Sequence, residues 1–158
     1  MDLAKKVVDK MINGDAFSKW LGIEVLEITA IFCKLKIKVR EEMTNGFKIA
    51  HGGITYSLAD SCLAFAANAD GFKAVSIETS ISHTQKVISG DVLTATAKEM
   101  HKSTKTGLYY ITVTNQSNIS SSFFIILIFR KPLFSSSVYR SFKMSNLNVI
   151  LVSNCNVI

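Results

Sequence analysis

The chain has 158 residues and a mass of 17.4 kDa, a length typical of one domain that buries about two thirds of its unfolded surface. Hydrophobic residues make up 48% and charged residues 19%, which excludes the charge-rich, apolar-poor composition of disordered proteins. Most of the formal charge of +6 lies after residue 115, where the chain has four basic residues and no acidic one. We therefore expect no nucleic-acid-binding surface.

The first eleven residues interleave charges with apolar side chains, unlike a secretory signal, and the longest apolar run, residues 123–129, is strand-sized. We expect no membrane span and a cytoplasmic location, with an organelle left open. Cys33, Cys62 and Cys155 lie far apart without a C-x-x-C pair. This spacing predicts neither a disulfide framework nor a zinc site, and we expect no metal or cofactor.

In chain order, apolar residues at helical spacing predict a helix over residues 3–12, ended by Asn13-Gly14. A second short helix is predicted to follow, with Asp15 as its N-cap and Gly22 after its end. From residue 23 to residue 40 the apolar residues alternate with polar ones, including a row of lysines. This period of two predicts a hairpin with one solvated face.

Residues 54–69 form an apolar segment without Gly or Pro, and the segment is apolar on most sides of a helix, so we expect a buried helix. Alternating segments at residues 75–83, 92–100 and 107–114 predict further strands. One long helix between an early hairpin and a late β-meander indicates an α+β fold, with an antiparallel sheet wrapped around a central helix.

Asp60 is the one acidic residue in this helix, and an unpaired buried carboxylate costs several kcal/mol. His51-Gly52-Gly53 marks the helix start, where backbone N–H groups lack intrahelical partners and can polarise a carbonyl oxygen. Asp60 would then activate water or attack the polarised carbon. Each feature also has an ordinary explanation, because glycine pairs form turns and helical acids often face solvent.

Gly52 and Asp60 lie about 12 Å apart along one helix at 1.5 Å per residue, too far to contact one carbonyl carbon. Two antiparallel copies of the helix would bring Gly52 of one subunit near Asp60 of the other. We therefore expect a homodimer with a site shared across its two-fold interface.

The sequence resembles the PaaI-like (phenylacetic acid degradation) family of hotdog-fold acyl-CoA thioesterases over roughly residues 10–116. The resemblance rests on matching motifs in unbroken order: Asn45-Gly46, His51-Gly52-Gly53, and residues 57–60, 64–68, 90–97 and 106–116. It implies a hotdog fold and edge-to-edge dimers, two of which usually form a homotetramer. It also implies hydrolysis of aryl-acetyl or medium to long acyl-CoA without cofactor.

By position in these motifs, the resemblance makes Asp60 the general base or nucleophile and the Gly52 amide the group that polarises the carbonyl. His51 and Asn45 would orient the thioester and the attacking water. Ser76 falls near a strand hydroxyl that contacts this water in some relatives, although a serine packed against its neighbours explains it equally well.

We divide the chain into a hotdog core at residues 1–116, a last strand of divergent sequence within 117–143, and an atypical tail at 144–158. The last strand has two candidate registers, one at residues 126–130 and one at residues 133–143. Because no acid follows Glu99, an altered C-terminus is one interpretation. Two other functions stay open: a non-catalytic acyl-CoA-binding protein inactivated by this C-terminus, and an enoyl-CoA hydratase.

Overall fold

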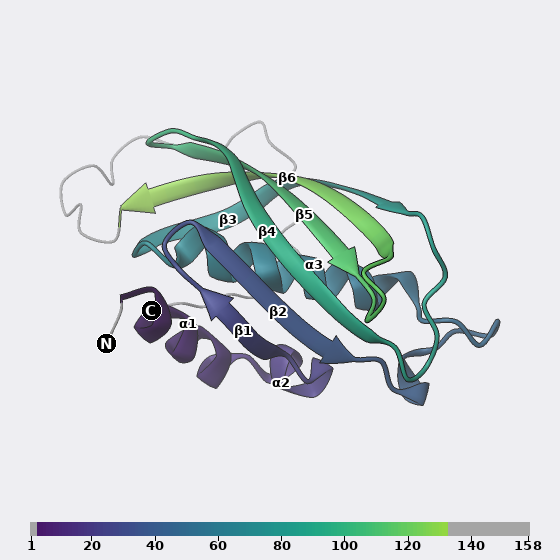
Figure 1. Cartoon of the computed structure of the whole chain (residues 1–158). Helices are drawn as coiled ribbons and strands as arrows, with labels where there is room; N and C mark the ends of the chain where they lie inside the picture. Colours follow the sequence, from purple (N-terminus) through teal and green to yellow (C-terminus); the bar gives the residue numbers. More distant parts are fainter. Residues whose placement is uncertain (1–2, 133–158) are drawn as a thin grey trace, which may run out of the picture.

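The structure, a computed structural model, describes residues 3–132 and places a long helix along the concave face of one curved sheet (Figure 1). The elements in chain order are α1 (Leu3–Gly14), α2 (Ala16–Leu21), β1 (Glu24–Ile28), β2 (Phe32–Lys38), the short 3₁₀ helix η1 (Glu41–Met43), α3 (Gly52–Asn68), β3 (Phe72–His83), β4 (Val92–Lys102), β5 (Thr106–Thr114) and β6 (Ser120–Pro132). These elements match the predicted helices, hairpin and later strands.

Helix α1 continues through Gly14, two residues past its predicted end, whereas α2 ends where the sequence predicts. The Asp15 carboxylate accepts a hydrogen bond of 3.0 Å from the Ser18 amide and so caps α2. Gly22 follows α2 with φ of 78°, a left-handed conformation that favours glycine. Both predicted boundaries of this helix are confirmed.

All six strands form one antiparallel sheet in the order β1-β2-β4-β5-β6-β3. Strand β6 contains residues 126–130, the first of the two predicted registers, and pairs with β5 on one side and β3 on the other. Residues 133–143, the second register, lie outside the described residues. β1 and β3 are the two edges of the sheet.

Helix α3 supplies much of the core, because its residues are apolar on nearly all sides. Leu58, Cys62 and Phe65 are buried against inward-facing side chains of the sheet, such as Leu35 and Ala95. The α+β prediction with a central helix is therefore confirmed. Cys33 and Cys62 are buried free thiols, and Cys155 lies outside the described residues.

An ion-pair network fastens the last strand to the far end of α3. Asp70 accepts hydrogen bonds from Lys102, at 2.7 Å, and from the guanidinium of Arg130 in β6. Arg130 is 3% exposed and lies over the ring of Phe72. Burial raises the pKa of Asp70, but hydrogen bonds from Lys102 and the Phe72 amide and the nearby cations outweigh it, so the pKa is lowered. The charge of Arg130 is therefore compensated inside the protein.

Within residues 3–132, no helix is long and apolar enough to cross a membrane.

Candidate active site

The start of α3 is held by the side chain of His51. Its Nδ1 accepts a 2.9 Å hydrogen bond from the Gly53 amide, and its own amide donates to the Met43 carbonyl at 2.9 Å. The ring is thereby fixed as an N-cap, and Nε2 is the ring nitrogen left for other contacts. The Gly52 amide belongs to the first turn, where N–H groups have no intrahelical acceptor and the helix dipole favours negative charge.

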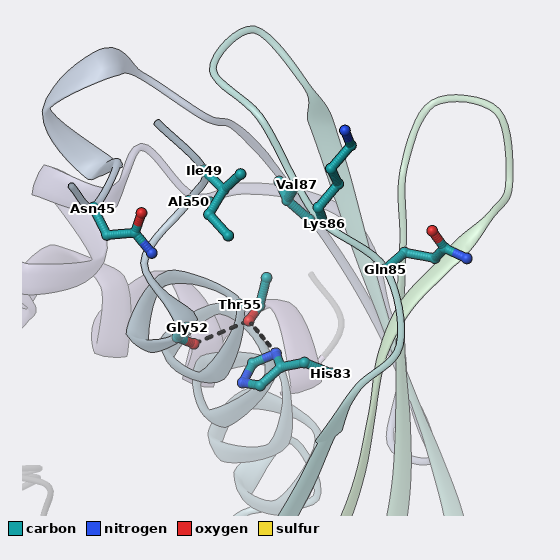
Figure 2. A pocket seen from close by; sticks show the side chains of 9 residues that line it. All are labelled: Asn45, Ile49, Ala50, Gly52, Thr55, His83, Gln85, Lys86 and Val87. Atoms are coloured by element: carbon teal, nitrogen blue, oxygen red, sulfur yellow. Dashed lines mark hydrogen bonds between the residues drawn. The ribbon is translucent and has the colours of Figure 1, made fainter. Parts of the chain in front are cut away.

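Asn45 lies beside this helix start in a tight turn. Its Oδ1 accepts a hydrogen bond of 2.9 Å from the Phe47 amide. The amide nitrogen of the side chain is free to donate elsewhere, and Figure 2 shows it on the side facing Gly52. The Asn45 side chain thus stabilises the turn through its oxygen, and its role in orienting a thioester or water stays a prediction.

A pocket of about 230 Å³ opens between this turn, the helix start and the loop after β3 (Figure 2). Its lining residues are Asn45, Ile49, Ala50, Gly52, Thr55, His83, Gln85, Lys86 and Val87. The structure thus brings two of the predicted site residues, Asn45 and Gly52, into one cavity, with His51 directly adjacent in the chain. Asp60 and Ser76 do not line it.

Asp60 lies two turns further along α3, half-buried. Burial raises the pKa of its carboxyl from 3.8 to about 6. The carboxylate makes no hydrogen bond or ion pair with any other residue between 3 and 132. No cation therefore neutralises it, and it keeps the elevated basicity expected of a general base.

Ser76 is half-buried on β3. Helix and strand run past each other so that Tyr56 meets Thr79, with 2.9 Å between their oxygens, while the Asn68 side chain binds the backbone of Ala74. Asp60 and Ser76 both fall between these two contacts along their elements. The roles predicted for the five residues remain predictions.

His83 is a residue of this pocket that the sequence reasoning missed, because in the sequence it is only the last residue of an alternating strand. Its Nδ1 lies 3.3 Å from the hydroxyl oxygen of Thr55 and 3.1 Å from that of Ser122. A Cβ atom placed on Gly52 would lie 3.1 Å from its Nε2. Thr55 and Ser122 are 28 and 39 residues away in the sequence, so no local pattern indicates the cluster.

No group of three or more His, Cys, Asp or Glu side chains that could hold a metal occurs in the part of the chain that the structure describes.

A long helix inside an antiparallel sheet, with its amide-rich start opening on a pocket, defines a protein of the hotdog fold. Comparison with solved structures supports this class. The PaaI protein of the E. coli phenylacetic acid degradation operon superimposes with a TM-score of 0.79 at 34% identity, covering 81% of this chain and 93% of that one. A variant of PaaI from Thermus thermophilus gives 0.71 at 29% identity, covering 74% and 100%.

Sequence comparison gives the family. Residues 47–121 match the model described as "Thioesterase superfamily". The acyl-coenzyme A thioesterase PaaI of Escherichia coli K12 is 36% identical over 114 residues, covering 72% of this chain and 81% of the relative. A putative esterase of Archaeoglobus fulgidus is 34% identical over 116 residues, covering 73% and 75%. The chain belongs to the thioesterase superfamily and is PaaI-like, which confirms the predicted resemblance.

Proposed function

We propose that this protein hydrolyses the thioester of an aryl-acetyl or medium to long acyl-CoA, releasing the free acid and CoA. The observation that carries the proposal is the unpaired carboxylate of Asp60, whose pKa is raised to about 6 on a helix that begins with Gly52 at a pocket. The name of the Escherichia coli relative, an acyl-coenzyme A thioesterase, supports the substrate class.

The carbonyl oxygen of the thioester binds at the start of α3. The Gly52 N–H donates to it, and the Asn45 side-chain amide lies near enough to orient it or the attacking water. The positive end of the helix dipole favours the negative charge that develops on this oxygen. One such donor accelerates acyl transfer by roughly 10²- to 10³-fold.

Asp60 removes a proton from the attacking water while the water oxygen bonds to the thioester carbon. The tetrahedral intermediate then collapses, the carbon–sulfur bond breaks, and the CoA thiolate takes up a proton. With a pKa of about 6, Asp60 is ionised at neutral pH and is still a stronger base than an ordinary aspartate. Direct attack by the carboxylate on the same carbon is the other route open to it.

A second copy of the chain completes the site. One side of α3 is a half-buried strip made of Gly53, Ser57, Asp60 and Ala64. This strip lies between Tyr56, which contacts β3, and the side of the helix that contacts α2. Nothing within residues 3–132 covers the Asp60 carboxylate with a polar partner. Small side chains let a second helix pack closely, and an antiparallel copy would bring its Asp60 to this Gly52. Ser76 would then approach the water from the strand beside it.

The first test is release of free thiol by the purified full chain, measured across short, long and aryl-acetyl CoA esters. We expect turnover of at least one ester. A thermal shift with CoA esters in the absence of thiol release would favour a non-catalytic binding protein instead. Loss of the enoyl absorbance of an enoyl-CoA without thiol release would favour a hydratase.

Sharing of the site is tested by co-expressing Asp60→Asn chains with Gly52→Val chains, each inactive alone. If each site combines both subunits, half of the random dimers are mixed and one of their two sites is intact, so about a quarter of wild-type activity returns. Absence of any recovery in isolated mixed dimers would show that both groups act within one chain.

A further inference from the structure

His83 is held beside Gly52 by the side chains of two other elements. The residue ends β3, Thr55 lies in the first turn of α3, and Ser122 lies in β6, where it pairs with His83 across the sheet. The two hydroxyl oxygens lie 3.3 Å and 3.1 Å from the same ring nitrogen, Nδ1. The other ring nitrogen, Nε2, is directed at the α-carbon of Gly52, and the ring lines the pocket (Figure 2).

The hydroxyl protons decide which ring nitrogen carries hydrogen. Thr55 donates to the Gly52 carbonyl at 3.0 Å. Ser122 is fully buried, and Nδ1 of His83 is the one partner that its hydroxyl has among residues 3–132. If Nδ1 carried the proton, the buried Ser122 hydroxyl would have no acceptor there, at a cost of about 1–3 kcal/mol. The arrangement in which both hydroxyl groups donate has Ser122 donating to Nδ1, which leaves Nε2 as the ring nitrogen that carries the hydrogen and can donate to a ligand.

We infer that His83 is a further catalytic residue, whose Nε2–H donates a second hydrogen bond to the thioester carbonyl oxygen bound at the Gly52 amide. The inference rests on the proposed function. It makes Ser122 a positioning residue that fixes the ring tautomer, and it places Nε2 3.1 Å from the position that a Cβ at residue 52 would take, closer than an ordinary van der Waals contact. A second donor aimed at the same oxygen adds to the polarisation that the Gly52 amide supplies.

Substitution of His83 separates a donor from a packing residue. His83→Phe keeps a flat ring and removes the donor, so we expect kcat for acyl-CoA hydrolysis to fall roughly 10²-fold with KM little changed. His83→Gln retains an N–H that reaches the same region, and we expect it to recover most of the lost rate. His101→Phe, the same exchange at an exposed position of β4 away from the pocket, is the matched control and is expected to be as active as wild type.

Two readouts do not depend on turnover. Nitrogen-15 NMR of the imidazole is expected to show hydrogen on Nε2 of His83 in the wild type and loss of that preference in Ser122→Ala, whose activity falls several-fold. Isotope-edited infrared spectra of a carbonyl-labelled acyl-CoA bound to the Asp60→Asn variant are expected to show a lower carbonyl frequency than in the variant that also carries His83→Phe.

The outcomes distinguish the two proposals. If wild-type protein releases no thiol, the hydrolase proposal fails, and the carbonyl frequency still decides whether His83 donates to the bound ester. If wild-type protein is active but His83→Phe matches it in kcat and in carbonyl frequency, or NMR places the hydrogen on Nδ1, the role of His83 is refuted while hydrolysis stands.

Discussion

Replacing Asp60 by asparagine is expected to abolish activity and to stabilise the fold in the same protein. Folding raises the pKa of this carboxyl from 3.8 to about 6 because burial disfavours the charged form. At 1.36 kcal/mol per pKa unit, keeping the carboxylate ionised in the folded protein costs about 3 kcal/mol. Asp60→Asn removes that cost at pH 7.5, which corresponds to an increase in Tm of about 6–12 °C for a chain of this size.

The stabilisation has a defined pH window. A raised carboxyl pKa means that the folded state binds the proton more tightly than the unfolded chain, so wild-type protein loses stability relative to the variant as pH rises. The difference is absent below pH 3.8, grows between 3.8 and about 6, and is complete above that value. Urea unfolding of both proteins at pH 4, 5, 6 and 7.5 measures it. Asp9→Asn, at an exposed position of α1, is the control and is expected to change neither stability nor activity.

The same pKa sets the pH profile of the enzyme. The ionised carboxylate is the base, so kcat/KM of wild type is expected to rise tenfold per pH unit below about 6 and to level off above it. Asp60→Asn is expected to lose at least ~10²-fold in kcat at every pH. A dithiodipyridine assay reports thiol release in acid as well as at neutral pH. A profile with its midpoint near 4, or a variant that is no more stable than wild type at pH 7.5, would refute the assigned burial.

Two further substitutions and one truncation test other parts of the structure. Gly52→Ala adds a Cβ 3.1 Å from the imidazole of His83, so we expect kcat/KM to fall at least ~10-fold with Tm unchanged. Gly14→Ala, whose added Cβ has no atom within 4 Å, is the control and is expected to change neither quantity. Kinetics and thermal melts of both variants measure these effects. Asp70→Asn leaves the buried guanidinium of Arg130 uncompensated and is expected to cost about 3 kcal/mol in urea unfolding, most of which returns when Arg130→Met is added. Removal of residues 144–158 is expected to leave thiol release unchanged, because β6 already pairs with both of its neighbours by Pro132; a truncated protein without activity would contradict the domain division.

Local patterns were sufficient to predict the elements of this fold. In β2 the apolar residues Cys33, Leu35 and Ile37 are buried, as the alternating sequence predicts. The cap at Asp15 could be predicted because it needs only one side chain and the backbone of the next helical turn. The position of β6 between β5 and β3 depends on pairings across the whole domain, and two registers fitted the sequence equally well. That choice is made by long-range contacts such as Asp70 with Arg130, which a single sequence does not display.

The site divides in the same way. The helix start could be predicted because His51, Gly52 and Gly53 are consecutive, and Asp60 stood out as the lone acid of an apolar helix. The separation of Asp60 from the pocket also follows from helix geometry alone. His83 could not be found, since its partners come from another helix turn and from the last strand, and a histidine at the end of a strand is unremarkable by itself.

The place of β6 in the sheet also governs when the protein can assemble during synthesis. Among the strands of residues 3–132, β3 pairs with β6 alone, and the paired residues lie from 39 positions apart (His83 with Ser122) to 60 apart (Phe72 with Pro132). An emerging chain therefore carries β3 without this pairing until β6 has left the ribosome, and an unpaired strand of this kind is prone to pair with other chains. The part of the pocket that His83 lines at the end of β3 can therefore form only after translation has passed β6.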